Sequence, residues 1–332
     1  MKHDVICIGG ITEDIMFHTD DLQVLKNSQP TGAGKLFAFE VGDKVLNDEQ
    51  VLYTFGGGGS NSAVGFARLG LKTALVGAIG IDPSALKILH HFKKEKVNLS
   101  FLQKIEHYWT GLSFVITAGS ASEHVIFTHR AANERLEIEA RRLASASSRW
   151  YYLTSLSGAG WQKNLANVYE VAGKKRIKIA WNPGATQLAE GYDYLKKYLR
   201  QTEVLILNKD EATSLAASLN SDSVKTKPKE LLTILSGFGP KAVAISDGAR
   251  GAYVCSGQQS YFAKALPFKA VNTTGAGDAF GSSLVGGLML YHSDLKKALR
   301  LAIIRSNYVV IKIGAQEGLL TLSEVKKIDG SL

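Results

Sequence analysis

The sequence predicts an α/β protein: a doubly wound, mostly parallel central sheet with helices on both faces, plus a small β-sheet lid. Two observations lead to this prediction. From about residue 134 onward, short apolar runs alternate with helix-length segments, which is the rhythm of a parallel sheet with crossover helices. Residues 14–55 and 108–130 instead hold strand-like pieces joined by turn residues. We therefore expect one domain over residues 1–332, in which these two β-only insertions pair with each other as the lid.

The elements follow in order along the chain. The apolar run DVICIGGI is expected to be a buried strand that ends in glycines. After the first insertion come a helix, SNSAVGFARLGL, a strand, TALVGAIG, and a helix, PSALKILHHFKKEK. In the second insertion, TGLSFVIT and EHVIFTHR flank AGSAS as a hairpin. Later strands are expected at RWYYLTSL, RIKIAWN, EVLILN, KAVAIS and GAYVCS, and helices near 161–174, 190–200, 209–219, 228–236, 275–291 and 294–312.

The charge balance favours an anionic ligand. Lys and Arg number 39 and Asp and Glu 30, which gives a net charge of +9. A basic surface suits nucleotides, phosphosugars or nucleic acid, although it also serves solubility alone. Because the basic residues are scattered and lack interleaved aromatic residues, nucleic acid is disfavoured as a partner.

The expected compartment is the cytoplasm. Cys7 and Cys255 lie in apolar, strand-like runs and suit small buried hydrophobes in a reducing environment. The opening MKHDVICIGG lacks the apolar length of a signal segment, and no run reaches membrane-span length. A membrane partner is therefore not expected.

The stretch NTTGAGDAFG, residues 272–281, combines a helix start with a carboxylate. Gly275, Ala276 and Gly277 precede a helical run, so their backbone N–H groups are expected to point outward at an anion, helped by the helix dipole. Such a loop suits a phosphoryl group that gains charge during transfer. Asp278 in the first turn is placed to accept a proton from an attacking hydroxyl. The alternative is that Asp278 only stabilises the helix start.

A second glycine run, TFGGGGSNSAVGFARLG, spans residues 54–70. Its glycines permit close approach of the backbone to a ligand. Asn61, one residue past the expected N-cap Ser60, offers a donor and an acceptor to hydroxyl groups. A flexible loop with a capping serine is the simpler alternative. The stretch has neither the P-loop lysine nor the dinucleotide-binding glycine pattern with its acidic residue, so those nucleotide-binding folds are disfavoured.

Three further polar residues follow predicted strands. In LILNKDEA, Asn208 and Glu211 stand three residues apart and share one face of the emerging helix. They are able to order magnesium beside a polyphosphate, directly or through water, or alternatively to form a capping box. Asp14, in GGITED, follows the first strand at the sheet edge where ligands collect, unless it only forms a turn.

Together these motifs resemble the ribokinase-like (PfkB-type) sugar and nucleoside kinases. The resemblance covers nearly the whole chain in order. It comprises GGITED for the N-terminal strand with its substrate-binding Asp, GGGGSNSAVGFARLG for the first signature, LNKDEA for the Asn-x-x-Glu motif, ISDGARGAYV for the nucleotide loop, NTTGAGDAFGSSLVGGL for the second signature and GAQEGLLTLSEV for the C-terminal end.

The resemblance implies magnesium-dependent transfer of the γ-phosphoryl group of ATP to a hydroxymethyl group, on a nine-stranded or similar sheet. It also implies a role for each matching residue. Asp278 is the general base; Gly275, Ala276 and Gly277 form the anion hole; Asn208 and Glu211 organise magnesium; Asp14, Gly57, Gly58, Asn61, Arg130 and Asn133 face the acceptor; Ser246, Gly248 and Gly251 lie near the nucleotide phosphates.

Several positions depart from the family pattern. Gly58 stands where ribokinases usually have Lys, and WYYLTSL lacks their Glu, so ribose is not the favoured acceptor. Asn272 replaces a common Asp and Gly318 a common Ser near the potassium site of the family, so dependence on potassium or another monovalent cation is doubtful. LNKDE also lacks the Pro typical of phosphosugar kinases, which favours an unphosphorylated acceptor.

The leading hypothesis is an ATP-dependent kinase acting on an unphosphorylated sugar or sugar derivative. A nucleoside kinase is the alternative, and a sugar or nucleotide sensor without turnover is a third hypothesis. The residues lining the lid discriminate between the two kinases, since aromatic faces suit a base and polar side chains a sugar. The aromatic candidates are Tyr53, Phe55, Phe114 and Phe127. An exposed lid face also predicts a homodimer formed through it.

Overall fold

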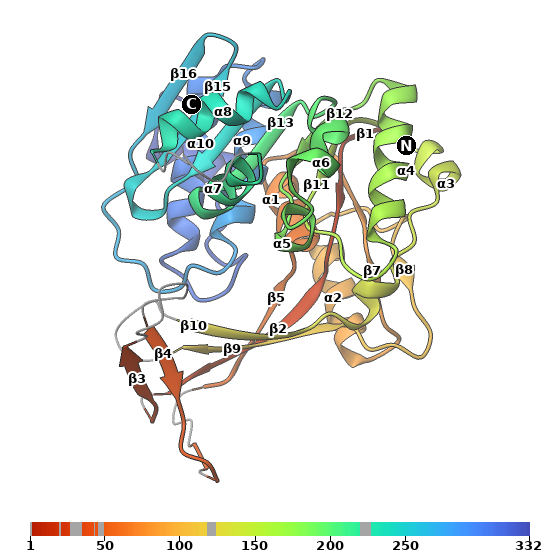
Figure 1. The fold of residues 1–332 in the computed structure, drawn as a ribbon. Helices are drawn as coiled ribbons and strands as arrows, with labels where there is room; N and C mark the ends of the chain where they lie inside the picture. Colours follow the sequence, from red (N-terminus) through yellow and green to blue (C-terminus); the bar gives the residue numbers. More distant parts are fainter. Residues whose placement is uncertain are drawn as a thin grey trace.

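The computed structural model describes residues 2–19, 21–26, 35–42, 44–45, 50–117, 124–219 and 227–332, and the structural statements below concern these residues. An eight-stranded sheet has the order β16-β15-β14-β13-β12-β11-β1-β6 (Figure 1). Its strands are β1 (Lys2–Ile8), β6 (Thr73–Val76), β11 (Ser147–Leu153), β12 (Lys178–Trp181), β13 (Val204–Asn208), β14 (Ala242–Ser246), β15 (Ala252–Ser256) and β16 (Gln259–Ala263). All pairings from β6 to β14 are parallel, whereas β15 and β16 join antiparallel.

Helices cover both faces of this sheet (Figure 1). One face packs against α1 (Gly58–Arg68), α2 (Pro83–Lys94), α9 (Ala276–Leu290) and α10 (Leu295–Val309). The other packs against α3 (Ala140–Ala144), α4 (Trp161–Lys175), α5 (Ala185–Leu188), α6 (Gly191–Leu199), α7 (Lys209–Ala217) and α8 (Pro228–Gly237). In β1, Val5 and Cys7 pack into the hydrophobic core on the side of α1 and α9, and Ile6 and Ile8 pack into the core on the side of α4 and α8. A strand buried on both sides therefore has an unbroken apolar sequence.

The predicted doubly wound α/β fold is confirmed. Each long helix and each predicted strand of the main sheet is present within a few residues of its expected place. The sequence prediction omitted the short helices α3, α5 and α11 (Leu322–Ile328) and the antiparallel strand β16. Short elements carry too few residues for a periodic signal, and β16 follows β15 after a turn at 257–258.

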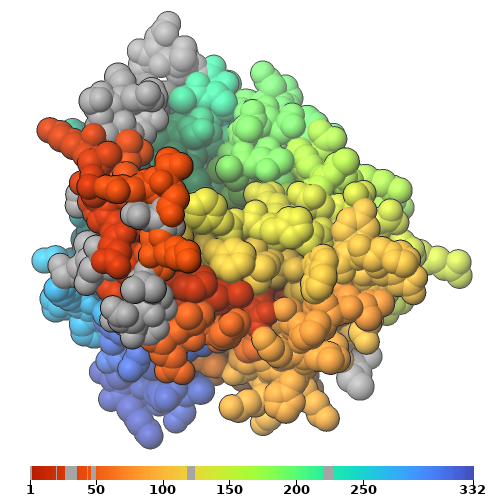
Figure 2. All heavy atoms as spheres, turned by 90° about the horizontal axis from the view of Figure 1, so that it is seen from below, coloured from red at the N-terminus to blue at the C-terminus, as the bar shows by residue number. Residues whose placement is uncertain are grey.

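A small separate sheet has the order β10-β9-β2-β5. It contains β2 (Thr12–His18), β5 (Leu52–Gly56), β9 (Gly111–Thr117) and β10 (His124–His129). The two β-only insertions pair through β2 and β9, which run parallel. The connection AGSAS lies outside the described residues. In Figure 1 this sheet lies below the main sheet, and the hairpin of β3 (Gln23–Lys26) and β4 (Lys35–Ala38) projects from it. Figure 2, from below, shows these red and orange segments beside yellow ones on the same face.

Two further features bear on the sequence-based expectations. Within the described segments, no helix has both the length and the apolar character needed to cross a bilayer. Both cysteines, Cys7 and Cys255, are buried and unpaired with each other.

Candidate active site

Two helices of the site begin at glycines with positive φ. Gly57 (φ 89°) is the N-cap of α1, and Gly275 (φ 78°) is the N-cap of α9. Neither helix has a side-chain cap, because glycine provides none. This corrects the expectation that Ser60 is the N-cap. Ser60 lies inside the first turn of α1, because the positive φ of Gly57 starts the helix earlier.

Close packing of α1 on α9 brings Asn61 to Asp278. The Asn61 Nδ2 donates to Asp278 Oδ2 over 2.8 Å. A Cβ on Gly65 of α1 would lie 2.4 Å from Ser282 Oγ on α9, so this approach requires glycine. The fully buried Arg305 joins the same helices by donating to Gly65 O and to Ser283 Oγ. The position of the two side chains is thus fixed by helix packing.

The second carboxylate oxygen of Asp278 faces the glycine run. A Cβ on Gly58 would lie 3.3 Å from Asp278 Oδ1 and 3.0 Å from Thr154 Oγ1. Glycine therefore leaves space beside the oxygen that Asn61 does not bind. Burial raises the pKa of Asp278, the hydrogen bond from Asn61 opposes this, and the charge of Asp14 adds to it. Burial therefore makes the Asp278 carboxylate a stronger base than that of a free aspartate.

The amides before Asp278 are only partly as expected. The Ala276 N–H donates to Thr273 O over 3.2 Å, so it closes a turn and does not point outward unpaired. This corrects the expectation for Ala276. The N–H groups of Gly275 and Gly277 have no hydrogen-bond acceptor in the described segments. The start of α9 therefore offers two free amides beside Asp278.

Asp14 lies within β2 and is buried, so it does not form a turn. Its Oδ1 accepts from Thr12 Oγ1 over 2.8 Å. Burial raises its pKa, hydrogen bonds from Thr12 and Ser113 lower it, and the nearby charges of Glu317 and Glu13 raise it. A Cβ on Gly56 would lie 2.0 Å from Asp14 Oδ2, so this glycine makes room for the carboxylate.

A polar row crosses the small sheet at Asp14. The pairing register places Thr54 of β5, Asp14 of β2, Ser113 of β9 and Thr128 of β10 directly opposite one another. Side chains of one cross-strand row point to the same face. Hydroxyl groups therefore flank the buried carboxylate on the face of the sheet that carries Asp14, and the charge of Asp14 acts on Asp278.

The aromatic residues of this sheet lie on its other face. Tyr53, Phe114 and Phe127 each neighbour a member of the polar row along their strand, so they point the opposite way. They are 60%, 39% and 58% exposed. Phe55, on that same side, stacks on His91 of α2 with 4.5 Å between the ring centroids. The aromatic candidates thus do not face Asp14.

The side chain of Asn133, which was expected to bind the phosphoryl acceptor, forms hydrogen bonds with the backbone instead. Its Oδ1 accepts from Ile11 N over 2.9 Å, and its Nδ2 donates to Ile11 O and to Arg130 O. Both amide hydrogens are engaged, so Asn133 holds the link between β1 and β2; this is a third correction, after Ser60 and Ala276. A long-range contact of this kind leaves no local signal in the sequence. Arg130 itself is exposed at the end of β10.

The predicted nucleotide loop and the start of α9 line one cavity of about 360 Å³. Ser246, Gly248 and Gly251 contribute one side, and Ala276 and Gly277 another. Further lining residues come from the same two motifs, and others come from the loop after β16 and from α10, where the sequence carries no motif. They are Ala249, Ala252, Ala265, Leu266, Phe268, Ala270, Thr273, Phe280, Ile303, Ser306, Asn307 and Val310.

Asn208 and Glu211 form a reciprocal capping box. The Asn208 Oδ1 accepts from Glu211 N over 2.9 Å, and Glu211 Oε2 accepts from Asn208 N over 2.8 Å. Burial raises the pKa of Glu211, and the charges of Asp210 and Asp278 raise it further. The second oxygen of Glu211 has no hydrogen-bond partner in the described segments. No cluster of three or more His, Cys, Asp or Glu suited to a metal occurs there either.

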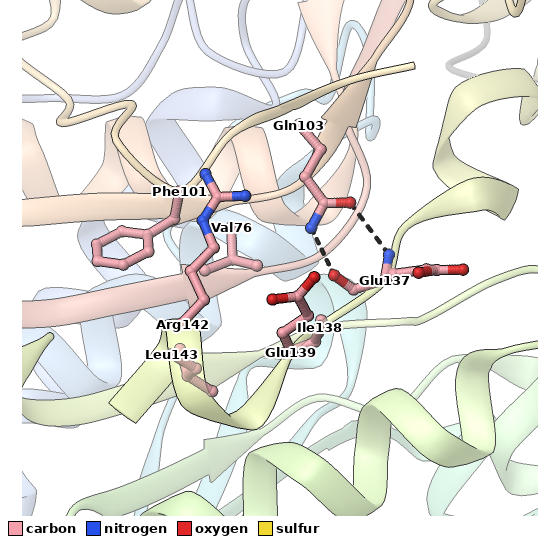
Figure 3. Close-up of a pocket in the computed structure, with 8 residues that line it drawn as sticks. All are labelled: Val76, Phe101, Gln103, Glu137, Ile138, Glu139, Arg142 and Leu143. Carbon is pink, nitrogen blue, oxygen red and sulfur yellow. Dashed lines mark hydrogen bonds between the residues drawn. The ribbon is translucent and has the colours of Figure 1, made fainter. Parts of the chain in front are cut away.

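A separate, small pocket lies at the other edge of the main sheet (Figure 3). It adjoins Val76 at the end of the edge strand β6 and contains none of the predicted site residues. In it, Gln103 donates to Glu137 O and accepts from Glu137 N. Gln103 thus holds a backbone segment in place.

The chain is similar in sequence to sugar kinases. Residues 34–322 match the model of the pfkB family carbohydrate kinases. A ribokinase from Haemophilus influenzae is 26% identical over 286 residues, which cover 85% of this chain and 89% of that protein. An ATP-dependent 6-phosphofructokinase from Thermoanaerobacterium thermosaccharolyticum is 23% identical over 340 residues, covering 98% and 94%.

Solved structures share the fold over nearly the whole chain. A ribokinase from Cryptococcus neoformans var. grubii serotype A in complex with ADP has a TM-score of 0.78 at 21% identity, covering 98% of this chain and 100% of its own. A nucleoside kinase from Burkholderia thailandensis in complex with inosine has a TM-score of 0.77 at 16% identity, covering 98% and 97%. An E. coli protein in complex with ATP and Mg²⁺ has a TM-score of 0.77 at 18% identity, covering 99% and 100%.

Proposed function

This chain belongs to the pfkB family of carbohydrate kinases and is an ATP-dependent phosphotransferase, and from that premise we propose that its acceptor is an unphosphorylated sugar or sugar derivative. The γ-phosphoryl group goes to a hydroxymethyl group of that acceptor. The proposal treats the chain as a single kinase domain whose small sheet serves as a lid over the acceptor.

The polar row of the small sheet is the observation that favours a sugar. Asp14 is buried, with Thr54 and Ser113 on either side and Thr128 next in the row. A buried carboxylate accepts hydrogen bonds from a polyhydroxylated ligand, and the hydroxyl groups beside it both accept and donate them. Such a site rejects a ligand without matching hydroxyls, because its buried polar groups are then left unpaired.

Asp278 is the base in this proposal. Its Oδ2 is held by Asn61, and its Oδ1 borders the space at Gly58, where the acceptor hydroxymethyl group would lie. The O–H proton passes to Oδ1 as the acceptor oxygen bonds to the γ-phosphorus and the bond to the ADP leaving oxygen breaks. A positioned general base contributes about 10²–10⁴ in rate.

The start of α9 is proposed to bind the transferring phosphoryl group. The free N–H groups of Gly275 and Gly277 lie where the helix dipole is positive. Gly277 also lines the cavity that contains Ser246, Gly248 and Gly251, which we assign to ATP. Its volume of about 360 Å³ falls in the range of roughly 300–1,000 Å³ found for small-molecule sites.

Magnesium is proposed to lie near Asn208 and Glu211. Glu211 keeps one carboxylate oxygen outside the capping box, which fits a hard cation. Because the described segments offer no cluster of three ligating side chains, phosphate oxygens and water would complete the coordination. Bound there, magnesium would neutralise charge on the polyphosphate, and Glu211 would be the side chain that holds it, directly or through water.

A nucleoside is the alternative acceptor, and one feature favours it. On the Asp14 face, the next row along the small sheet is apolar: Leu52, Met16, Val115 and Ile126. An apolar row beside a hydroxyl-binding row would suit a base attached to a ribose. The nucleoside kinase of the same fold is bound to inosine.

A homodimer through the outer face of the small sheet is also proposed. Tyr53, Phe114 and Phe127 form an exposed aromatic patch there, and such patches mark association sites. Light scattering of the Phe127→Ser variant tests this, since loss of the aromatic ring should lower the mass toward that of one chain. An unchanged mass of two chains would place the interface elsewhere, and a single-chain mass in the unmodified protein would exclude the dimer.

An acceptor panel tests the proposed function. ATP consumption with magnesium is measured across pentoses, hexoses, sugar acids, nucleosides and phosphosugars. We expect turnover on an unphosphorylated sugar, and Ser113→Ala should raise the KM for that sugar by about tenfold without changing the KM for ATP. Phe114→Ala, its neighbour on the outer face, is the matched control. Turnover restricted to nucleosides or phosphosugars would overturn the proposal.

A further inference from the structure

A chain of side-chain hydrogen bonds runs from α2 to Asp278. The ring Nε2 of His91 lies 2.7 Å from Gln316 Oε1, and Gln316 Nε2 donates to Asn61 Oδ1 over 2.9 Å. Asn61 Nδ2 then donates to Asp278 Oδ2 over 2.8 Å. Four side chains from α2, the C-terminal segment, α1 and α9 are thereby connected in series.

Chemistry fixes the direction of every bond in this series. The ionised Asp278 carboxylate only accepts, so Asn61 must present its NH₂ group to it and its carbonyl oxygen to Gln316. Gln316 must then donate from Nε2 and accept at Oε1. His91 must therefore be the donor, so its Nε2 carries a proton. Each donor points toward Asp278, and aligned bonds of this kind reinforce one another.

The members of the series are held rigidly. Arg68 donates to Gln316 O over 2.6 Å and to Leu319 O over 2.9 Å, while Glu95 accepts two hydrogen bonds from the same guanidinium. The His91 ring stacks on Phe55, one residue before Gly56, whose backbone adjoins Asp14. Gln316 is buried and bonds Ser60 Oγ as well. The bonds to His91, Ser60 and Asn61 together keep the side-chain amide of Gln316 from rotating.

We propose that His91 and Gln316 are positioning residues for the base: they hold the Asn61 amide so that its NH₂ group binds Asp278 Oδ2 and leaves Oδ1 for the acceptor. Without Gln316, the Asn61 amide is free to turn over, which would place its carbonyl oxygen against the carboxylate. The inference rests on the proposed role of Asp278 as base. It adds two residues that have no part in binding ATP or the acceptor.

Charge and donor substitutions test the two positions. Gln316→Glu keeps the size but removes the donor to Asn61, and it should lower kcat by at least about tenfold while the KM for ATP stays within about twofold. His91→Phe keeps the ring against Phe55 without the donor, and it should lower kcat by about three- to tenfold. His91→Gln restores an N–H donor and should recover most of that loss.

Matched controls separate positioning from general damage. His90→Phe changes the exposed neighbouring histidine on α2. Gln103→Glu changes a glutamine that is also hydrogen-bonded twice, at the distant pocket of Figure 3. Both should keep kcat within about twofold. Equal kcat losses in controls and test variants, or no rescue by His91→Gln, would contradict the positioning role. His91 and Gln316 would then contribute only to packing.

A measurement without turnover keeps the inference independent of the proposed function. The ¹³C-carboxyl resonance of Asp278, followed by NMR against pH, reports its protonation. Gln316→Glu should move that titration upward by about half a unit or more, since Asp278 loses the Asn61 donor and gains a nearby negative charge. An unchanged titration would overturn the inference whether or not an acceptor is known. A shifted titration in a protein inactive on every acceptor would keep the series and remove the kinase proposal.

Discussion

Two helix N-termini of the site, those of α7 and α9, differ in whether side chains cap their backbone amides. In α7, Asn208 and Glu211 satisfy each other's N–H groups through a complete capping box. In α9, Gly275 offers no side chain, and the amides of Gly275 and Gly277 have no acceptor in the part of the chain that the structure describes. The start of α7 thus has a reciprocal side-chain cap, whereas the start of α9 has none and is open to an anion.

The difference shows what each start can contribute. The side-chain cap stabilises the start of α7 without a ligand, and the Glu211 oxygen outside the capping box is left as a donor atom for a cation. An open N-terminus has unmet hydrogen-bonding capacity that a phosphoryl group fulfils. We therefore assign the transferring group to α9 and magnesium to α7. The predictions below test this division.

The largest effect is expected at Gly275. Its φ is 78°, and a Cβ there would lie 2.5 Å from Ala315 Cβ. Gly275→Ala should therefore lower kcat at least about 100-fold and also lower the Tm, since a non-glycine residue in the left-handed region is strained by about 1–2 kcal/mol. Gly277→Ala, whose Cβ meets nothing within 4 Å, should keep the Tm unchanged. Equal Tm losses in both variants would show that the α9 start is not specially constrained.

The next effect is the dependence of activity on pH. Burial raises the pKa of Asp278 above its usual value of 3.8. Protonation at low pH removes the base, so kcat/KM should fall about tenfold per unit below that raised pKa. The effect of pH on stability has the opposite sign. Because the pKa of Asp278 is higher in the folded state than in the unfolded state, the free energy of unfolding increases as the pH falls through the folded-state pKa. A pH–rate profile flat down to pH 4 would contradict the assignment of Asp278.

A smaller effect is expected at α7. Glu211→Gln keeps the capping box, because Gln also serves at this position, but removes the charge. We expect a nearly unchanged Tm and a several-fold rise in the magnesium concentration needed for half-maximal rate. Asn208→Ala, by contrast, should cost about 1 kcal/mol of unfolding free energy. A lower Tm in Glu211→Gln without altered magnesium dependence would leave α7 with a capping role alone.

The smallest effect concerns monovalent cations. Asn272 is buried beside the α9 loop; its Oδ1 accepts from Thr274 N, and its Nδ2 has no partner within the described segments. Because an N–H group repels a cation, exchange of potassium for tetramethylammonium should change kcat by less than about twofold. A strong activation by potassium would contradict this expectation.

The sequence predicted the fold well because its signals are local. The strands of the main sheet are buried on both faces and appear as unbroken apolar runs, and the long helices have clear periodicity. The insertions lacked helix-length patterns, and β2 and β9 indeed pair with each other. Short elements such as α3 and β16 were omitted because a few residues give no period.

The local geometry of the candidate site was predictable where a residue and its setting are neighbours in sequence. Asp278 after its glycines is such a case, and so is the Asn208–Glu211 pair, for which both the metal-organising and the capping alternatives had been open. Long-range contacts were not predictable. Asn133 bonds to Ile11 across 122 positions, and Gln316 bonds to His91 across 225. No periodicity or motif encodes such a pairing.

Single-turnover transfer by the Asp278→Asn variant tests the central claim most directly. Enzyme in excess over γ-³²P-ATP is mixed with the sugar acceptor, and labelled product is followed alongside ATP binding by calorimetry. The account predicts unchanged ATP affinity within about twofold and a transfer rate reduced by about 10² or more. Transfer at the rate of the unmodified protein would show that Asp278 is not the base and that the open start of α9 acts without it.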